Sequence, residues 1–218
     1  MERILYAGDS TAAFNKINTY PQTGMSQALP LYLKDDIQVI SFAKNGSSTR
    51  SFIAEGRLAA IGRELKKGDY LFVQFGHNDS KTDKARHTEP DTDFKDNLLT
   101  FAKTAEACGA KAVFITPIAR RLFDEKGVFK PGSHGAYPGA MKEAAKEAGV
   151  PVVDLTAVTE AYLAEVGELW SRPLFVWPKD NTHLKYEGAV MMAGFLADGL
   201  RALGEPYSSL LADEKEEH

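Results

Sequence analysis

Short apolar runs alternate with longer stretches of mixed polarity along this chain, and the two kinds of segment predict different elements. Five runs are predominantly hydrophobic and do not alternate with polar residues, which is typical of strands covered on both faces: Ile4–Ala7, Ile37–Phe42, Tyr70–Phe75, Ala112–Thr116 and Val150–Val153. The longer stretches repeat apolar residues with a helical period and predict helices over 24–33, 52–66, 92–108, 137–148, 154–167 and 186–203. This alternation predicts an α/β fold, a three-layer α/β/α sandwich around a five-stranded parallel sheet.

No linker divides the chain, and its 218 residues are within the size that one hydrophobic core supports. We therefore expect a single domain over residues 1–210. The last segment, 211–218, is mostly acidic and offers little to bury, so we expect it to be a disordered tail.

Two predicted loops, 76–91 and 117–136, are longer than a simple connection needs. Each follows the carboxyl end of a predicted strand. Open α/β sheets bind ligands at that edge, so these loops are candidate walls of a site.

Charge and hydropathy narrow the classes of partner. The net charge is −4 and no basic block is present, which argues against a nucleic-acid partner. The amino-terminal residues lack the pattern of a signal peptide, and no apolar run reaches membrane-spanning length. We therefore expect a cytoplasmic protein without a membrane partner. The lone Cys108 has no internal disulfide partner and is interpreted as a packing residue.

Four polar motifs stand at the ends of predicted strands or just before the last helix: Gly8–Thr11, Asn45–Arg50, Gly76–Asp79 and Asp180–His183. Each has an ordinary structural explanation when taken alone. Ser10 suits a helix N-cap, Asn45 with Gly46 is a common turn pair, and Asn78 suits a capped turn. The first three motifs follow strands of one parallel sheet, so we expect them to meet at its carboxyl edge.

The spacing of Asp180 and His183 places both side chains on one side of a turn, where the carboxylate can hold the imidazole. A serine hydroxyl needs such a base, and the base needs an orienting acceptor. The pattern predicts Ser10, His183 and Asp180 as catalytic residues. Zinc binding is the alternative for the pair, but no third ligand with recognisable spacing accompanies it, so we predict no metal.

In this order, the four motifs resemble the sequence blocks of the GDSL or SGNH hydrolases, over residues 8–183. The resemblance implies a flavodoxin-like SGNH hydrolase fold, a Ser-His-Asp triad and no cofactor. It also implies an oxyanion hole made by the backbone N–H groups of Ser10 and Gly46 and the side-chain amide of Asn78. We expect Asp9 to secure the turn beside Ser10, and we expect His77 to point away from the chemistry.

A closer resemblance is to the rhamnogalacturonan acetylesterases, which remove acetyl groups from pectin; it is carried by residues 8–11, 45–52, 73–79 and 180–184. It implies an acetylated oligosaccharide as substrate. Because pectin carries carboxylates, Arg50 and Arg120 are candidate substrate-binding residues, although each also suits a solvated surface. Trp177 is a candidate for stacking on a sugar ring or for packing in the core.

Two other functions stay open. A GDSL esterase or lipase acting on a lipid ester, a thioester or acetylated xylan has the same motifs, although a lipase favours more apolar loops than 76–91 and 117–136. A non-enzymatic nucleotide-binding or sugar-binding module is the second alternative. A phosphate site calls for a glycine-rich loop that Gly8–Ala13 does not match.

Overall fold

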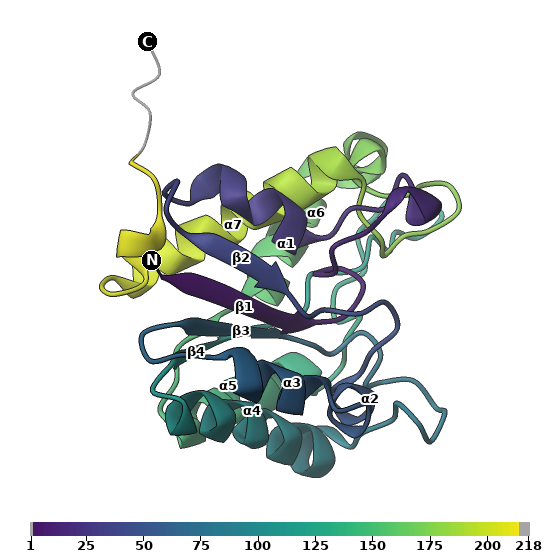
Figure 1. Ribbon diagram of the computed structural model, residues 1–218. Coiled ribbons are helices and arrows are strands. Elements are labelled where there is room, and N and C mark those ends of the chain that lie inside the picture. The colour runs from purple at the N-terminus through teal and green to yellow at the C-terminus, as the bar shows by residue number, and fades with distance from the viewer. Residues whose placement is uncertain (1, 214–218) are drawn as a thin grey trace.

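A parallel five-stranded sheet forms the centre of the computed structural model, which describes residues 2–213 (Figure 1). Its strands are β1 (Arg3–Gly8), β2 (Gln38–Ser41), β3 (Tyr70–Gln74), β4 (Lys111–Ile115) and β5 (Val152–Val153). They lie in the order β2-β1-β3-β4-β5, and every neighbouring pair is parallel. The predicted fold class is confirmed.

Helices cover both faces of the sheet (Figure 1). On one face lie α1 (Met25–Ala28), α6 (Leu155–Ser171) and α7 (Tyr186–Leu203). On the other lie α2 (Thr49–Ala54), α3 (Arg57–Glu64), α4 (Lys95–Ala107) and α5 (Tyr137–Ala148). Short turns of 3-10 or π-helix are η1 (Ile17–Thr19), η2 (Leu29–Tyr32), η3 (Pro90–Phe94), η4 (Arg172–Leu174) and η5 (Ser208–Leu210).

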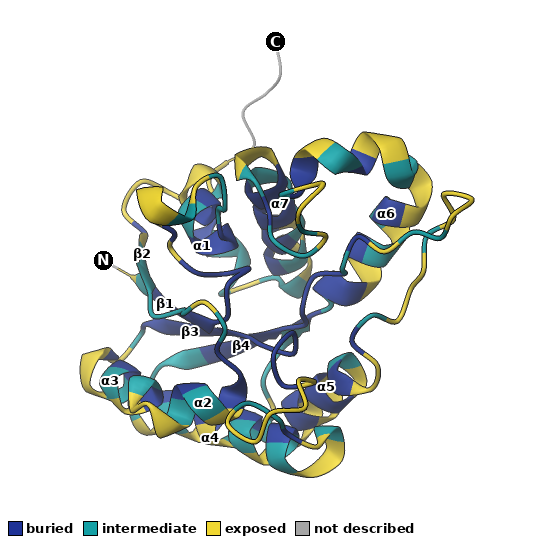
Figure 2. Cartoon of the chain, turned by 90° about the vertical axis from the view of Figure 1, so that its right-hand side faces the viewer, coloured by how far each residue is buried: buried dark blue, intermediate teal, exposed yellow. Residues whose placement is uncertain are grey.

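Each strand sends alternate side chains into two separate hydrophobic cores, one on each side of the sheet. In β1, Ile4 and Tyr6 belong to the core beneath α7, whereas Leu5 and Ala7 belong to the core beneath α4. Because both faces are covered, the strands are rich in apolar residues on both sides. Figure 2 shows the resulting buried centre inside helices with exposed outer faces.

Several predicted boundaries differ from the structure. The helix predicted over 52–66 is two helices, because Gly56 adopts a left-handed conformation with φ of 73° between α2 and α3. The helix predicted over 24–33 is the single turn α1 followed by η2. The strand predicted over Val150–Val153 is shortened to β5, since Pro151 has no N–H to donate to a ladder.

The chain packs beyond the predicted start of the tail at residue 211. Leu211 is buried and forms an antiparallel bridge with Leu33, and the N–H of Ala212 donates to the carbonyl oxygen of Tyr32 at 3.0 Å. The predicted boundary therefore falls inside packed chain, because Leu211 is an apolar residue that the core buries. Residues 214–218 lie outside the described residues, and disorder there stays a prediction. Over residues 2–213, no helix has both the length and the apolar character needed to cross a bilayer.

Candidate active site

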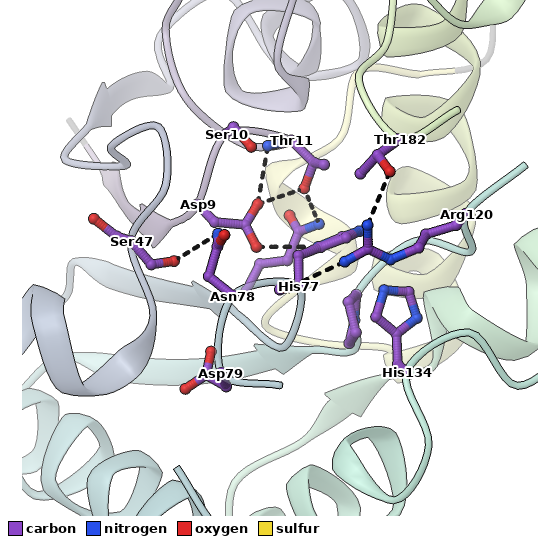
Figure 3. Close-up of polar contacts among 12 residues, drawn as sticks. Asp9, Ser10, Thr11, Ser47, His77, Asn78, Asp79, Arg120, His134 and Thr182 are labelled. Atoms are coloured by element: carbon purple, nitrogen blue, oxygen red, sulfur yellow. Dashed lines mark hydrogen bonds and ion pairs between the residues drawn. The ribbon is translucent and has the colours of Figure 1, made fainter. Parts of the chain in front are cut away.

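Loops at the carboxyl edge of the sheet bring the four polar motifs together, as predicted. Ser10 follows β1, Ser47 follows β2, and Asn78 follows β3. The side-chain amide of Asn78 donates to the carbonyl oxygen of Ser47 at 3.0 Å, which joins two of these loops (Figure 3). The fourth motif arrives from the loop before α7, where the N–H of Thr23 also donates to the carbonyl oxygen of Leu184 at 2.9 Å.

Ser10 sits in a tight turn directly after β1. The carbonyl oxygen of Asp9 accepts the N–H groups of Ala12 at 3.2 Å and Ala13 at 3.0 Å. A Cβ atom on Gly8 would lie 2.9 Å from the Cβ of Ala12 and 3.0 Å from the carbonyl oxygen of Gln74, so only glycine fits before this turn.

The side chain of His183 lies between Ser10 and Asp180. Its Nε2 atom is 2.8 Å from Ser10 Oγ, and its Nδ1 atom is 2.6 Å from Asp180 Oδ2. The second oxygen of Asp180 accepts the N–H groups of Thr182 at 2.6 Å and His183 at 2.9 Å, which fixes the carboxylate relative to its own loop. With the Nδ1 proton directed at Asp180, Nε2 is the atom that can accept the hydroxyl proton of Ser10.

Asp180 is held as a carboxylate. Partial burial acts to raise the pKa of Asp180, but the hydrogen bonds from His183 and Thr182 outweigh it and the pKa lies below its ordinary value. A carboxylate that stays ionised beside an imidazole favours the protonated ring that forms when a histidine acts as a base.

Each of the three predicted oxyanion donors has an N–H proton that the described part of the fold leaves without an acceptor. Among residues 2–213, neither the N–H of Ser10 nor that of Gly46 has a hydrogen-bond acceptor. Gly46 adopts a φ of 80° in its turn, a conformation that suits glycine. The amide of Asn78 carries two protons and uses one of them on Ser47, so the other is available.

A buried polar network lies beneath the turn of Ser10 (Figure 3). One oxygen of Asp9 accepts the N–H and the hydroxyl of Thr11 at 2.9 and 2.8 Å, so Asp9 does secure the turn. Its other oxygen is 3.0 Å from His77 Nδ1. Burial opposes ionisation of Asp9, but His77 and Thr11 outweigh it and the pKa of Asp9 is lowered.

The network continues into β3 in a way that the sequence analysis missed. Gln74 donates to Thr11 Oγ1 at 3.3 Å and accepts from the hydroxyl of Tyr6 at 2.7 Å. The sequence does contain a signal for this network: Gln74 is a glutamine in an otherwise apolar strand. A fully buried side-chain amide needs hydrogen-bond partners, so its position indicates a buried polar network.

His134 is a second residue that sequence analysis missed. Its ring contacts the ring of His77 edge-on, with centroids 4.5 Å apart. Burial, followed by the charges of His77 and Arg120, lowers the pKa of His134 to about 2, so this ring is neutral. His134 therefore brings the loop 117–136 against the buried network beneath Ser10, and the role of this loop as a wall of the site stays a prediction.

The candidate substrate-binding residues occupy three different settings. Arg50 is half-exposed and forms an ion pair with Asp93. Arg120 is half-buried, and its guanidinium group donates to the carbonyl oxygen of His77 and to Thr182 Oγ1. Trp177 is not a core residue: it is 36% exposed, and the guanidinium group of Arg172 stacks 4.5 Å from its ring centroid.

A groove of about 350 Å³ lies beside the loop of Asp180. Trp177 lines it together with Arg121, Phe123, Asp124, Glu125, Gly127, Glu168, Arg172 and Asn181. The arginines of the groove are paired with Glu168, which leaves little free positive charge there. In the part of the chain that the structure describes, no group of three or more His, Cys, Asp or Glu side chains is arranged to hold a metal ion.

Comparisons with known proteins agree with this geometry. The model of the GDSL-like lipase/acylhydrolase family matches residues 6–189. The chain is 40% identical to the rhamnogalacturonan acetylesterase RhgT of Bacillus subtilis, over 99% of this chain and 97% of that one.

Solved structures with the same architecture include the protein YxiM of Bacillus subtilis, with a TM-score of 0.83 and 27% identity over 94% of this chain and 57% of that one. They also include the acetylxylan esterase Axe2 of Geobacillus stearothermophilus, with a TM-score of 0.66 and 18% identity over 94% of this chain and 95% of that one. The likeness to Axe2 concerns the fold alone. Taken together, the motifs, the sheet and these relatives establish that the chain belongs to the GDSL-like lipase/acylhydrolase family and is a carboxylic ester hydrolase.

Proposed function

We propose that this protein is a serine esterase that removes O-acetyl groups from acetylated rhamnogalacturonan oligosaccharides. The observation that carries the chemistry is the contact of 2.8 Å between Ser10 Oγ and His183 Nε2, with Asp180 on the far side of the imidazole. The substrate class rests on the 40% identity to RhgT, an enzyme named for this activity, over nearly the whole of both chains.

In the proposed mechanism, Ser10 Oγ attacks the acetyl carbonyl carbon while His183 Nε2 takes the hydroxyl proton. His183 then returns the proton to the departing sugar oxygen, and an acetyl group remains on Ser10. Asp180 stays ionised and stabilises the imidazolium ring. A water molecule attacks the acetyl group by the same sequence of proton transfers, which releases acetate and restores Ser10.

The negative charge that develops on the carbonyl oxygen is stabilised by the N–H groups of Ser10 and Gly46 and the amide of Asn78. Each donor is fixed before the substrate arrives: Ser10 by its turn, Gly46 by the loop after β2, and Asn78 by its bond to Ser47. Removing one such donor costs roughly 100- to 1,000-fold in kcat in comparable sites.

Acetylated xylan is the alternative carbohydrate ester, and the fold does not decide between the two substrates. Acetate release is therefore measured in parallel from acetylated rhamnogalacturonan oligosaccharides, acetylated xylan and 4-nitrophenyl acetate. The variants are Ser10→Ala and, as a matched control, Ser208→Ala, which removes a hydroxyl that bonds Glu205 on the surface.

We expect release from the rhamnogalacturonan substrate, loss of that release in Ser10→Ala, and full activity in Ser208→Ala. Release from xylan alone would replace the proposed substrate and keep the chemistry. Activity that survives in Ser10→Ala would overturn the proposed nucleophile.

A further inference from the structure

The guanidinium group of Arg120 lies between the two loops that carry the proposed catalytic groups. Its Nη2 donates to the carbonyl oxygen of His77 at 3.0 Å, and its Nη1 donates to Thr182 Oγ1 at 3.0 Å (Figure 3). His77 is the residue before Asn78, and Thr182 is the residue before His183. The planar guanidinium group of Arg120 therefore connects the loop of Asn78, a proposed oxyanion donor, with the loop of His183, the proposed base.

The backbone around Arg120 is itself anchored. The N–H of Ala119 donates to Thr159 Oγ1 at 2.8 Å, and that of Arg120 donates to Ser133 Oγ at 3.2 Å. The next N–H, of Arg121, donates to the carbonyl oxygen of Asn181 at 2.8 Å. The loop of Asp180 and His183 is thus held three times by this segment: through the backbone N–H of Arg121, through the Arg121 guanidinium group, which donates to Asn181 Oδ1 at 3.2 Å, and through Arg120.

Charge also favours this placement. Burial lowers the pKa of Arg120, whereas the carboxylates of Asp9 and Asp180 act to raise it. Arginine keeps its charge in proteins, so the cation offsets part of the negative charge of these two buried or half-buried groups.

We infer that Arg120 is a positioning residue, not a ligand of the substrate: it fixes the His77–Asn78 loop relative to the Thr182–His183 loop. The inference rests on the roles proposed above for Ser10, Asn78 and His183. Displacing a catalytic group by about 1 Å costs on the order of 100-fold in rate, which is the scale of effect a residue of this kind controls. Lysine has one compact charge and cannot reproduce the planar two-armed geometry.

The test uses Arg120→Gln, Arg120→Lys, Thr182→Val and the double variant Arg120→Gln/Thr182→Val. Arg57→Gln is the matched control, because Arg57 also donates to a backbone carbonyl, that of Phe42 at 3.0 Å, and pairs with Glu55. The kcat and KM values are measured with neutral 4-nitrophenyl acetate and with the acidic rhamnogalacturonan substrate. Far-UV circular dichroism melts report folding.

For Arg120→Gln we expect kcat to fall by about 10- to 100-fold, with KM changed less than about twofold. The factor by which kcat falls should be the same on both substrates. Arg120→Lys regains part of the loss. Thr182→Val lowers kcat by roughly two- to tenfold, as expected for one lost hydrogen bond. The double variant loses less than the product of the single losses, because both changes break the same bond. Arg57→Gln keeps the wild-type values.

A rise in KM confined to the acidic substrate would show that Arg120 binds a substrate carboxylate and would overturn the inference. A lower melting temperature with unchanged kcat would reduce Arg120 to a structural role. If Arg120→Gln does not fold, Arg120→Lys and Thr182→Val carry the test with the same expected pattern. Failure of the pectic substrate is separate, since the comparison is still made on 4-nitrophenyl acetate.

Discussion

At the scale of single residues, the proposed chemistry depends on where one proton of His183 resides. Asp180 accepts from Nδ1 and so leaves Nε2 free to face Ser10. The meeting of these three side chains was predictable from sequence, because each belongs to a motif that follows a strand or precedes a helix. The contacts of Arg120 and His134 were not predictable, because the sequence pattern does not indicate where a side chain on a long loop points.

Asp180→Asn is expected to lower kcat by about 1,000- to 10,000-fold with little change in KM, as for the equivalent change in other triads. Its amide oxygen can still accept the N–H groups of Thr182 and His183. Its amide nitrogen would face Nδ1 and drive the ring proton to Nε2, where it blocks the base. Steady-state kinetics with 4-nitrophenyl acetate measure the effect, and a loss below tenfold would contradict the role of Asp180.

Asp79 gives the molecule a stability that depends on pH. Burial raises the pKa of Asp79 to about 6, although Thr49 and Thr88 donate to one of its oxygens; the other oxygen has no partner among the described residues. The folded pKa exceeds the ordinary value of 3.8, so the native state binds the proton more tightly. The stabilisation is present below pH 4 and is lost as the pH rises through about 6.

The wild type is therefore expected to lose stability between pH 4 and pH 7, whereas Asp79→Asn has no carboxyl group at this position and avoids that loss. The difference in unfolding free energy between the variant and the wild type should shift in favour of the variant by on the order of 3 kcal/mol over this range. Urea unfolding at the two pH values measures the difference. The exposed variant Asp35→Asn serves as the control and should show no comparable change. A difference that is the same at both pH values would contradict the raised pKa of Asp79.

At the scale of elements, all five strands were predictable from their apolar residues, and the signal was strongest for β1, β3 and β4, which are buried on both faces. Helix ends were less predictable, since a single glycine decides whether a helical period continues or breaks. Gly56 interrupts the predicted helix over 52–66 through its left-handed backbone, whereas Gly139 lies inside α5 without interrupting it.

These two glycines give a matched pair of predictions. Gly56→Ala should destabilise the protein by about 1–2 kcal/mol, because an alanine is strained at a φ of 73° even though no atom lies within 4 Å of its Cβ. Gly139→Ala meets no atom within 4 Å either, and it should stabilise by about 0.5–1 kcal/mol because its backbone is helical. Unfolding by urea measures both, and changes of the same sign would refute the conformational explanation.

At the scale of the whole molecule, the sheet separates two hydrophobic cores. The three-layer fold predicted a core on each face of the sheet, but the sequence did not show which residues pack together in each core. Alternate residues of a strand face opposite sides, but continuous apolar runs do not indicate which of the two cores each residue joins. The strand order, with β1 between β2 and β3, is what brings Ser10, Ser47 and Asn78 to adjacent loops, and it depends on long-range pairing that local patterns do not report.

A substitution at Phe101 tests whether the core beneath α4 contributes to stability without affecting the kcat of the active site. Its ring packs against Phe52 and Phe75 with centroids 5.7 and 5.5 Å apart. Phe101→Ala should cost about 3–5 kcal/mol of unfolding free energy. The kcat of the folded enzyme should stay within about threefold of the wild type, because the site is built on the sheet edge. A much larger kinetic loss would show that this core sets the loop geometry directly.

Ser10 and His183 are 173 residues apart in the sequence and meet only in the finished fold. If Ser10 and His183 act as proposed, β1 and the loop before α7 must both be in place before ester cleavage is possible, and a fragment that ends before His183 is expected to be inactive. Contacts of such long range form late, because the intervening chain must first be ordered. On the proposed mechanism, the return of ester cleavage during refolding therefore reports the moment at which the loop after β1 meets the loop before α7.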